Sequence, residues 1–584
     1  MYKGQCSLFQ EENMKAKKKL IGILLVIVVV VLSLGVLTAC GETPGETSKN
    51  KKAVVICTAL LSGGLYDTKT NEAIWDPVAE GVYFQQVFPG GDMMGLVMAV
   101  LTDKTTYDLI GGIMKYKDES VENLLWQITL DEQGKSNNPN LRPANVRPTT
   151  ADGTFKSTLY NDSGEVVDGY GAYTAGEKIQ YGAIAAYRQQ CLDLKARYEK
   201  QGWDVVVFNY DWRIDNRINS ELLEQFIQTN GWEEVILTSH SMGGPVVAGY
   251  IARLQNKWLE AEAEAQKNHT TQTAVKKPSE IIRAYRAFSP ATAGSLDAIY
   301  YLDDPTGAIA DVVNGTVGDT LGGVVLGVDA ISEGIKKLAG PLAQNLTSVM
   351  QLLPFQTFAD SDYYGENESP VYVDGVPVTN MYEWYCSRPW AHTSDWKPGV
   401  DGIYDKLKPG MKNLPAYWES FYVKESVNDK DANVYAPELV NTTYCLGVGY
   451  NTKKSVQIVT KDTDTVKVNK VTYEMWDTKN HKYDTPLTSI EYYSYDHKAI
   501  LFGDGDGTMP TNACLGGLNY NGDKTISNTK GRAIYPLPEA RQTTTICYYN
   551  TNHGTVGGYW DVLKWDFYEM MDKIIVEDEI NPFF

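Results

Sequence analysis

Short, uninterrupted apolar runs alternate with amphipathic stretches along much of this chain, and the two patterns predict different elements. An unbroken apolar run is typical of a strand buried on both faces, and apolar residues repeating about every 3.6 positions are typical of a helix. Strands are predicted over residues 53–57, 204–209, 234–238, 281–288, 442–449 and 543–549. Helices are predicted over residues 183–201, 220–228, 245–253 and 559–575. The alternation favours an α/β fold, in which a mostly parallel sheet is flanked by helices.

Three stretches interrupt this alternation and are predicted to be insertions. Residues 103–175 are rich in Asn, Pro and Gly turn signals, which indicates a loop-rich insertion. Residues 291–440 separate two predicted core strands and are interpreted as a cap, whose apolar middle, residues 315–355, either faces acyl chains or forms the cap's own core. Residues 451–500 alternate Tyr, Thr and Val with Lys and Asp, as in β-hairpins. A polar stretch, residues 260–279, is predicted to be an exposed linker.

The amino terminus carries an export pattern. Lys15 and three lysines at residues 17–19 precede an apolar run over residues 20–37, and the sequence Leu-Thr-Ala-Cys ends at Cys40. A basic head followed by an apolar segment and small residues is typical of a secretory signal. The ending resembles a bacterial lipobox, which implies cleavage before Cys40 and lipidation of that residue. The alternative is an uncleaved membrane helix, since about 18 apolar residues nearly span a bilayer.

Both alternatives put the remainder of the chain outside the cytoplasm. The lipoprotein hypothesis puts it on the extracellular face of a bacterial cell membrane, anchored by lipidated Cys40. The predicted organisation is then a signal peptide over residues 1–39, a lipidated tether over 40–52, a first core part over 53–290, a cap over 291–440 and a second core part over 441–584.

The chain is acidic, with a formal net charge of −20. Residues 1–39 contain five Lys and two Glu, a net +3, so the mature chain would carry −23. An acidic surface argues against nucleic acid as a partner and against electrostatic adhesion to anionic lipid, so membrane contact is expected through the anchor. Six cysteines remain once Cys6 is cleaved off and Cys40 is lipidated, and these six are either buried free thiols or disulfides. No two cysteines have the C-x-x-C spacing of a metal site.

A serine between small residues joins a predicted strand to a predicted helix. Ser241 lies in the sequence S-H-S-M-G-G, residues 239–244, directly after the strand of residues 234–238. Strand, tight turn with a serine, and helix form the nucleophile elbow of α/β-hydrolases, usually G-x-S-x-G, although Ser239 replaces the first glycine here. The alternative is an ordinary connection whose serine caps the helix.

A serine nucleophile needs a base and an orienting acid, which follow it along this fold in the order Asp, His. Of the six histidines in the chain, His553 follows the predicted strand 543–549 and precedes a predicted helix, which is the position expected of the base. The other five lie beside the serine, in the linker, in the cap or in the hairpin region: His240, His269, His392, His481 and His497.

Two aspartates lie in a glycine-rich turn between Ser241 and His553. The apolar run of residues 500–503 leads into the sequence D-G-D-G-T, which contains Asp504 and Asp506. One of the two carboxylates is expected to accept the ring N–H of His553 and to fix its tautomer. The alternative is calcium binding, because D-x-D-G-T imitates the start of a calcium loop, but the glycine at its sixth position and its closing glutamate are missing. No metal and no cofactor is therefore expected.

These segments together resemble the lecithin:cholesterol acyltransferases and their phospholipase A relatives. The most discriminating match is the Y-D-W-R run at residues 210–213, and G-D-G-T at residues 505–508 is similar to the acid loop of that family. Residues 60–63 look like its oxyanion loop, although Thr58 and Ala59 replace the usual Pro-Gly. The resemblance covers roughly residues 53–67, 203–256, 281–297, 442–451 and 501–575, and the cap lies outside it.

The resemblance implies an α/β-hydrolase with a triad of Ser241, Asp506 and His553, in which Asp506 rather than Asp504 is the acid. The expected reaction is acyl transfer from a lipid ester through an acyl-enzyme at Ser241. Water as the acceptor gives a lipase or phospholipase, an alcohol gives an O-acyltransferase, and the triad is the same for both. Two alternatives stay open, namely a small-ester esterase and a non-catalytic surface binding protein on a hydrolase scaffold.

The resemblance also implies roles for residues outside the triad. The main-chain N–H groups of Met242 and Leu60 would form the oxyanion hole. Asp211 and Arg213 would join the core to the cap rather than take part in the chemistry.

The anchor leads to a first prediction. Because the Leu-Thr-Ala-Cys sequence follows an apolar segment, palmitate incorporation and membrane fractionation should both vanish in Cys40→Ala. Metabolic labelling with palmitate and fractionation of cells test this. A processed Cys40→Ala variant, or a mature terminus well away from Cys40, would contradict it.

Overall fold

The chain divides into two units, Met1–Glu46 and Thr47–Phe584. The computed structural model describes only residues of the second unit, namely residues 50–67, 69, 73–75, 126–143, 185–272, 274–303, 305, 340, 342–361, 363–365, 367–427, 430–448, 450–458, 475–477, 482–484, 502–515, 532–536, 543–549, 551–553 and 562–577. The predicted signal peptide and Cys40 therefore lie outside the described residues. Within the described residues, no helix is both long enough and apolar enough to cross a membrane.

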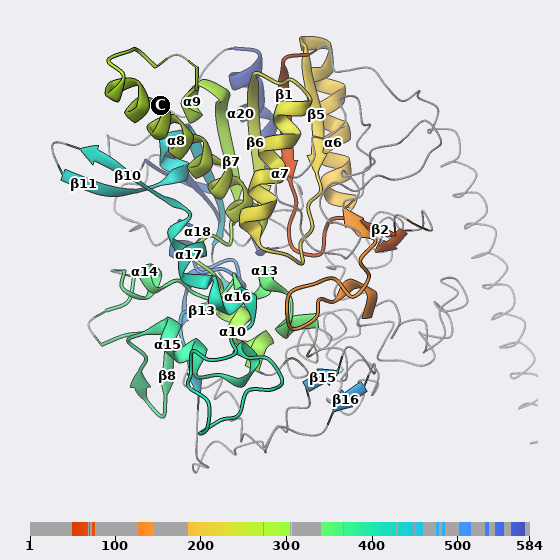
Figure 1. Ribbon diagram of the computed structural model, residues 1–584. Helices are drawn as coiled ribbons and strands as arrows, with labels where there is room; N and C mark the ends of the chain where they lie inside the picture. The colour runs from red at the N-terminus through yellow and green to blue at the C-terminus, as the bar shows by residue number, and fades with distance from the viewer. Residues whose placement is uncertain are drawn as a thin grey trace, which may run out of the picture. The chain divides into compact units, whose positions relative to one another are not determined.

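A seven-stranded sheet forms the centre of the second unit (Figure 1). Its order is β18-β19-β12-β7-β6-β1-β5, and every neighbouring pair is parallel except β18 with β19. The strands are β1 (Lys52–Cys57), β5 (Trp203–Phe208), β6 (Glu234–His240), β7 (Ile282–Phe288), β12 (Thr442–Val448), β18 (Arg532–Pro536) and β19 (Thr543–Tyr549). Six of the seven coincide with the predicted strands, which confirms an α/β fold with a mostly parallel sheet.

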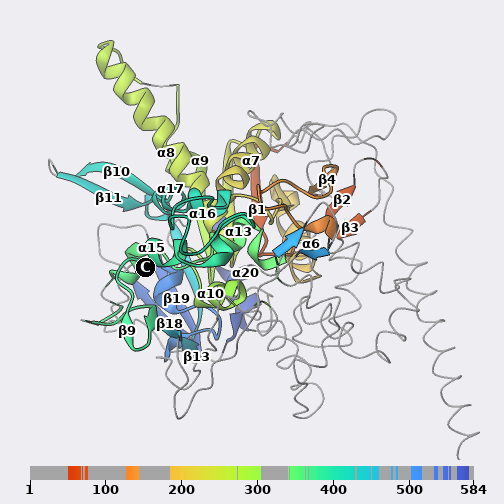
Figure 2. The same cartoon turned by 60° about the horizontal axis from the view of Figure 1, so that its bottom comes forward.

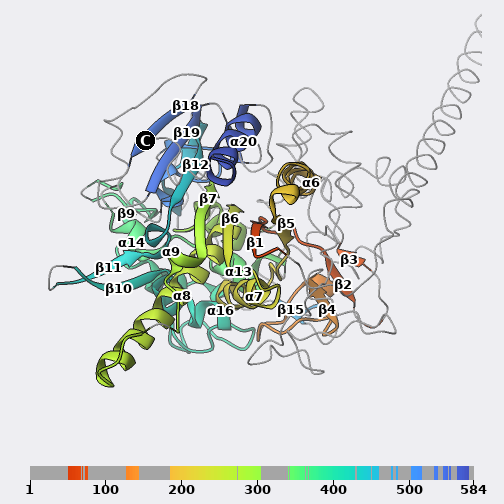
Figure 3. The same cartoon turned by 90° about the horizontal axis from the view of Figure 1, so that it is seen from above.

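Helices cover both faces of this sheet, as its unbroken apolar strands require. Helices α6 (Ala185–Tyr198) and α20 (Val562–Ile575) lie on one face, and α7 (Asn216–Thr229) and α8 (Gly243–Lys267) on the other (Figure 3). On β1, Val54 packs in a cluster with Tyr198 and Phe567, whereas its neighbour Val55 packs in a second cluster with Phe226 and Val247. The sheet therefore has a core on each side.

Two helix boundaries differ from the prediction. Helix α7 begins four residues earlier than expected, because the Asp215 carboxylate accepts the N–H of Arg217 and caps its first turn. Helix α8 continues to Lys267, so residues 260–267 of the predicted exposed linker belong to this helix. These residues are Ala, Glu, Gln and Lys, which are strong helix formers, and this end of α8 extends beyond the sheet (Figure 2).

The chain between β7 and β12, two neighbouring strands, contains the segment predicted to be a cap. Its described elements are α10 (Leu296–Asp303), α13 (Thr347–Met350), α14 (Gln356–Ala359), β8 (Val371–Val373), β9 (Val376–Pro377), α15 (Met381–Cys386), α16 (Pro409–Lys412), α17 (Leu414–Glu419), β10 (Tyr422–Val427) and β11 (Lys430–Tyr435). In the predicted apolar middle, Leu346, Met350 and Phe355 are buried in the same cluster as residues of the central sheet. This part of the apolar stretch packs inside the protein, and residues 315–339 lie outside the described residues.

The remaining elements are short. The predicted hairpin region contains β13 (Tyr450–Lys453), β14 (Val456–Ile458) and the antiparallel pair β15 (Met475–Asp477) and β16 (Lys482–Asp484). A strand further on, β17 (Phe502–Gly505), pairs with β13. Near the amino terminus, β2 (Leu65–Asp67), β3 (Ala73–Trp75) and β4 (Leu141–Pro143) form a three-stranded sheet. Helices α9 (Pro278–Ile281) and α18 (Thr511–Cys514) have one turn each. Most of the predicted loop-rich insertion, residues 103–125 and 144–175, lies outside the described residues.

Candidate active site

Strained backbone gathers where three adjacent strands of the sheet end. Strand β6 pairs with β1 through Ser239 and Cys57, and with β7 through His240 and Phe288. Residues that follow these strands have positive φ although none is glycine, with +63° at Leu61, +51° at Ser241 and +35° at Ser289. Such a conformation costs about 1–3 kcal/mol per residue and concentrates at functional sites.

The turn after β6 holds Ser241 by its main chain. The Ser241 N–H donates to the Phe288 carbonyl at 3.1 Å, and the Ser241 carbonyl accepts the N–H groups of Gly244 and Ala291, each at 2.9 Å. A Cβ on Gly243 would lie 2.7 Å from the carbonyl oxygens at the end of β1, so no larger residue fits there. The turn thus has the tight packing expected of a nucleophile elbow.

The structure explains why serine is tolerated at position 239, where the sequence pattern expects glycine. Ser239 is buried, and its hydroxyl forms a 2.6 Å hydrogen bond with the hydroxyl of Tyr285 on β7. A buried polar group with a partner avoids the penalty of an unsatisfied one. The departure from G-x-S-x-G is therefore accommodated by a neighbouring strand.

Asp506 and His553 form a direct pair. The ring Nδ1 of His553 lies 2.8 Å from Asp506 Oδ2, and the His553 main-chain N–H donates to the Asp506 carbonyl at 3.0 Å. Since the carboxylate can only accept, Nδ1 carries the proton, and in the neutral ring Nε2 is the acceptor. Asp506 is 1% exposed: burial raises its pKa, but the neighbouring His553 and the hydrogen bonds outweigh this and lower the pKa below its ordinary value.

The contacts of Asp506 do not favour the calcium alternative. Its Oδ1 accepts the main-chain N–H groups of Thr508 and Met509, at 3.0 and 2.7 Å, and its Oδ2 faces His553. Both oxygens thus face N–H donors rather than open space. Among the residues that the structure describes, no group of three His, Cys, Asp or Glu side chains is arranged to hold a metal ion.

The strand before the acid loop lies outside the central sheet. Residues 502 and 503 of the apolar run belong to β17, which pairs with β13. Asp506 reaches the site because the next-to-last residue of β12 is a glycine: a Cβ on Gly447 would lie 2.8 Å from the Asp506 Cβ and 2.2 Å from the Thr551 carbonyl. The glycine lets the acid loop and the histidine loop approach the same strand end.

Two further residues support the pair and were not predicted. The Nε2–H of buried His240 donates to the His553 carbonyl at 3.1 Å, and the two rings lie 4.8 Å apart. Burial, together with repulsion from His553, lowers the pKa of His240 to about 3, so this ring is neutral. Ser289 is fully buried after β7; its hydroxyl accepts the Gly447 N–H at 3.4 Å, and it helps to lower the pKa of Asp506. Sequence offers no signal for these contacts beyond the position of His240 next to Ser241.

The structure shows direct contact between two of the three predicted triad residues. Asp506 and His553 are bonded to each other, and His240, which precedes Ser241, is in contact with His553. The part of the Ser241 hydroxyl in catalysis stays a prediction. The side chain of Asp504 lies outside the described part of the structure, as do His481 and His497 of the predicted hairpin region. His392 is buried in the predicted cap, where its ring stacks on Trp396.

The two predicted oxyanion donors lie on adjoining segments. Met242 precedes α8, and its neighbour Gly243 packs on the carbonyls of Cys57 and Thr58, where the loop of Leu60 begins. Within the described part of the chain, the N–H groups of Met242 and Leu60 donate no hydrogen bond to another residue. This leaves both donors available, and their role stays a prediction.

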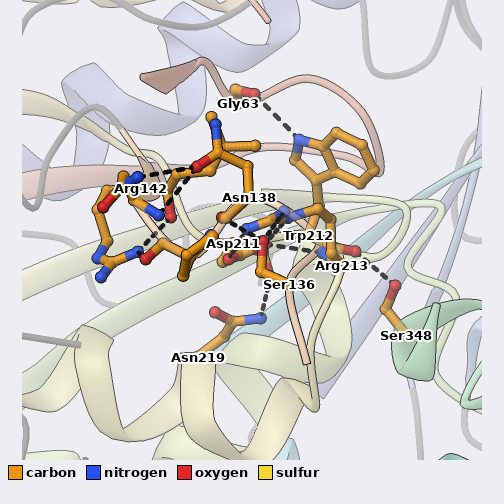
Figure 4. Close-up of polar contacts among 12 residues, drawn as sticks. Gly63, Ser136, Asn138, Arg142, Asp211, Trp212, Arg213, Asn219 and Ser348 are labelled. Carbon is orange, nitrogen blue, oxygen red and sulfur yellow. Dashed lines mark hydrogen bonds and ion pairs between the residues drawn. The ribbon is translucent and has the colours of Figure 1, made fainter. Parts of the chain in front are cut away.

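The Y-D-W-R run contains a fully buried ion pair (Figure 4). Arg213 donates from Nε and Nη2 to the two oxygens of Asp211, each at 2.8 Å, and from Nη1 to the Ser136 hydroxyl at 2.9 Å. Ser348 of α13 donates its hydroxyl to the Trp212 carbonyl. The main chain of the run thus contacts the predicted cap, whereas the guanidinium contacts the earlier insertion at Ser136.

Comparisons with known proteins add little to this geometry. No family model matches the chain, and no curated protein matches it. Among solved structures, the chain is similar to one in "The crystal structure of Tle4-Tli4 complex", with 13% identity and a TM-score of 0.35, over 80% of this chain and 89% of that chain. At that TM-score the likeness supports no conclusion about activity.

The acid loop leads to a second prediction. Asp506→Asn should lower kcat by roughly four orders of magnitude, because an amide no longer fixes the His553 tautomer. Asp504→Asn removes the same charge two residues away and should change kcat little. Steady-state kinetics on an ester substrate compare the two variants. Equal losses, or loss of activity on adding a chelator, would favour the calcium alternative.

Proposed function

We propose that this protein is a serine acyl hydrolase or O-acyltransferase that acts on lipid esters through an acyl-enzyme at Ser241. The observation that carries the proposal is the 2.8 Å pair of Asp506 and His553, in contact with the strained turn that presents Ser241. A buried carboxylate that orients a histidine is the arrangement that activates a serine hydroxyl.

The proposed fold is that of the α/β-hydrolases. Its support is the order of the chain: Ser241 follows β6, Asp506 comes after β12 and β17, and His553 follows β19. That is the sequence of nucleophile, acid and base in this fold. The long segment between β7 and β12 would be the cap, and the resemblance to lecithin:cholesterol acyltransferases is part of the same proposal.

The proposed reaction has two halves. His553 Nε2 takes the hydroxyl proton of Ser241 as Oγ attacks the ester carbonyl carbon. The resulting oxyanion is bound by the N–H groups of Met242 and Leu60, each lowering the barrier by about 3 kcal/mol. The bond to the leaving alcohol then breaks as His553 returns the proton to that alcohol. Water or a second alcohol attacks the acyl-enzyme as His553 takes its proton. The bond to Ser241 Oγ then breaks as His553 returns that proton to Oγ, which releases the free acid or the new ester.

The proposed substrate is a lipid ester at the outer face of the membrane, where lipidated Cys40 anchors the enzyme. The support is the resemblance of the core segments and the predicted anchor. The acidic chain offers no attraction to anionic headgroups, so substrate binding has to come from acyl-chain burial, about 0.8 kcal/mol per methylene. Because residues 342–355 pack inside the protein, the proposed acyl-binding surface belongs to the rest of the predicted cap.

A covalent serine probe tests the activity. A fluorophosphonate should label the wild-type protein at Ser241, and Ser241→Ala should abolish labelling. Ser239→Ala is the matched control, because it removes a hydroxyl two residues away that is bonded to Tyr285, and it should still be labelled. A wild-type protein that the probe does not label would contradict the proposal and favour the alternative of a non-catalytic surface binding protein.

Substrate choice is tested with p-nitrophenyl esters. The value of kcat/KM should rise with acyl length beyond butyrate and rise again with micelles or vesicles, and a long-chain alcohol should divert part of the acyl group to a new ester if transfer competes with hydrolysis. Strict preference for acetate or butyrate, with no response to an interface, would leave a small-ester esterase.

A further inference from the structure

Three aromatic side chains donate hydrogen bonds to the main chain of the loop after β1. The Tyr210 hydroxyl donates to the Thr58 carbonyl at 2.8 Å, the Trp75 indole donates to the Leu61 carbonyl at 2.8 Å, and the Trp212 indole donates to the Gly63 carbonyl at 3.0 Å. Figure 4 shows the indole of Trp212 directed at Gly63. We call Trp75, Tyr210 and Trp212 the aromatic clamp.

Two peptide groups connect the hydrogen bond of Trp75 to the proposed oxyanion donor, which is the Leu60 N–H. In a trans peptide the C=O and the following N–H are fixed in opposite directions, so a bond to one orients the other. The Leu61 carbonyl bound by Trp75 shares its peptide with the Ser62 N–H, which donates to the Ala59 carbonyl at 3.3 Å. The Ala59 carbonyl in turn shares its peptide with the Leu60 N–H.

The loop needs such support, because it is strained. Leu61 has a φ of +63°, a conformation that persists only where the surroundings fix it. A Cβ on Gly63 would lie 3.2 Å from the Tyr210 carbonyl, so the loop runs close to the Y-D-W-R turn. The rings of Trp75 and Trp212 also contact each other edge to face, with centroids 6.0 Å apart.

The Y-D-W-R turn that carries two members of the clamp is itself fixed. The Asp211 carboxylate accepts the main-chain N–H of Arg213 at 3.1 Å besides its guanidinium, and Asn219 of α7 donates to the Asp211 carbonyl at 2.9 Å. All of these groups are buried. The turn is therefore a rigid base from which Tyr210 and Trp212 reach the loop.

We propose that Trp75, Tyr210 and Trp212 are positioning residues that hold the Leu60 N–H in place for the oxyanion. The proposal rests on the proposed function and assigns to the Y-D-W-R run a role at the site itself. None of the three side chains is asked to touch the substrate. Their effect is on transition-state stabilisation, because the oxyanion forms only there.

The test replaces each clamp residue by phenylalanine, which keeps an aromatic ring and removes the donor. Trp75→Phe, Tyr210→Phe and Trp212→Phe should each lower kcat and kcat/KM about ten-fold or more with little change in KM, the signature of an interaction lost in the transition state. The substrate is a p-nitrophenyl ester, and the full chain is used. Thermal unfolding of each variant gives the folded fraction.

Two matched controls lose a hydrogen bond from an aromatic side chain elsewhere in the protein. Tyr198→Phe removes a hydroxyl that donates to Asp572 at 2.7 Å, and Trp232→Phe keeps a ring but removes an indole that donates to Asp204 at 2.6 Å. Both side chains are buried and lie away from the loop. The controls should lower the unfolding temperature and leave kcat within two-fold of the wild type.

The outcomes separate this proposal from the proposed function. Clamp variants with kcat within two-fold of the wild type, or with losses equal to those of the controls, overturn the clamp while labelling of Ser241 stands. A wild type that no fluorophosphonate labels overturns both. If Trp212→Phe does not fold, Trp75→Phe decides, because its indole binds the peptide whose Ser62 N–H donates to the Ala59–Leu60 peptide.

Discussion

The turn between β6 and α8 approaches the ends of two neighbouring strands so closely that glycine alone fits on its helical side. A Cβ on Gly243 would lie 2.7 Å from the carbonyl oxygens that end β1, and a Cβ on Gly244 would lie 2.3 Å from Pro290, which follows β7. This contact sets where Ser241 lies relative to both neighbouring strands. The loop after β1 and the loop after β7 therefore both pack against the turn, and each has a strained residue of its own, Leu61 and Ser289.

The acid and the histidine depend on each other in the same way. Asp506 is 1% exposed, and a buried carboxylate is unfavourable unless it is paired and hydrogen-bonded. Its partners are His553 and two N–H groups of its own turn, while Gly447 leaves room for both loops at the end of β12. Removal of the His553 ring would take one hydrogen-bond donor away from the buried carboxylate. The contact that orients the histidine therefore also stabilises the two loops.

Regions outside the sheet are linked to the site through the buried pair of Asp211 and Arg213. A buried ion pair is weak evidence for stability, but removal of one partner usually costs about 3–5 kcal/mol, because the other charge stays buried. Here the pair also fixes a turn that contacts Ser136 in one insertion, Ser348 in another and the loop after β1. A disturbance of either insertion therefore acts on the same turn that borders the site.

The sequence determined six of the seven strands of the central sheet, the four helices that cover it, and the positions of Ser241 and His553. These follow from local patterns: buried strands are unbroken apolar runs, and the residues that follow them share one edge of a parallel sheet. Tertiary structure decided the rest. Asp506 reaches His553 from the end of β17, a strand outside the central sheet, Ser239 is tolerated through Tyr285, and His240 bonds a residue 313 positions away. None of these contacts has a periodicity or a spacing, since each depends on which side chain a distant strand or loop brings within hydrogen-bond distance.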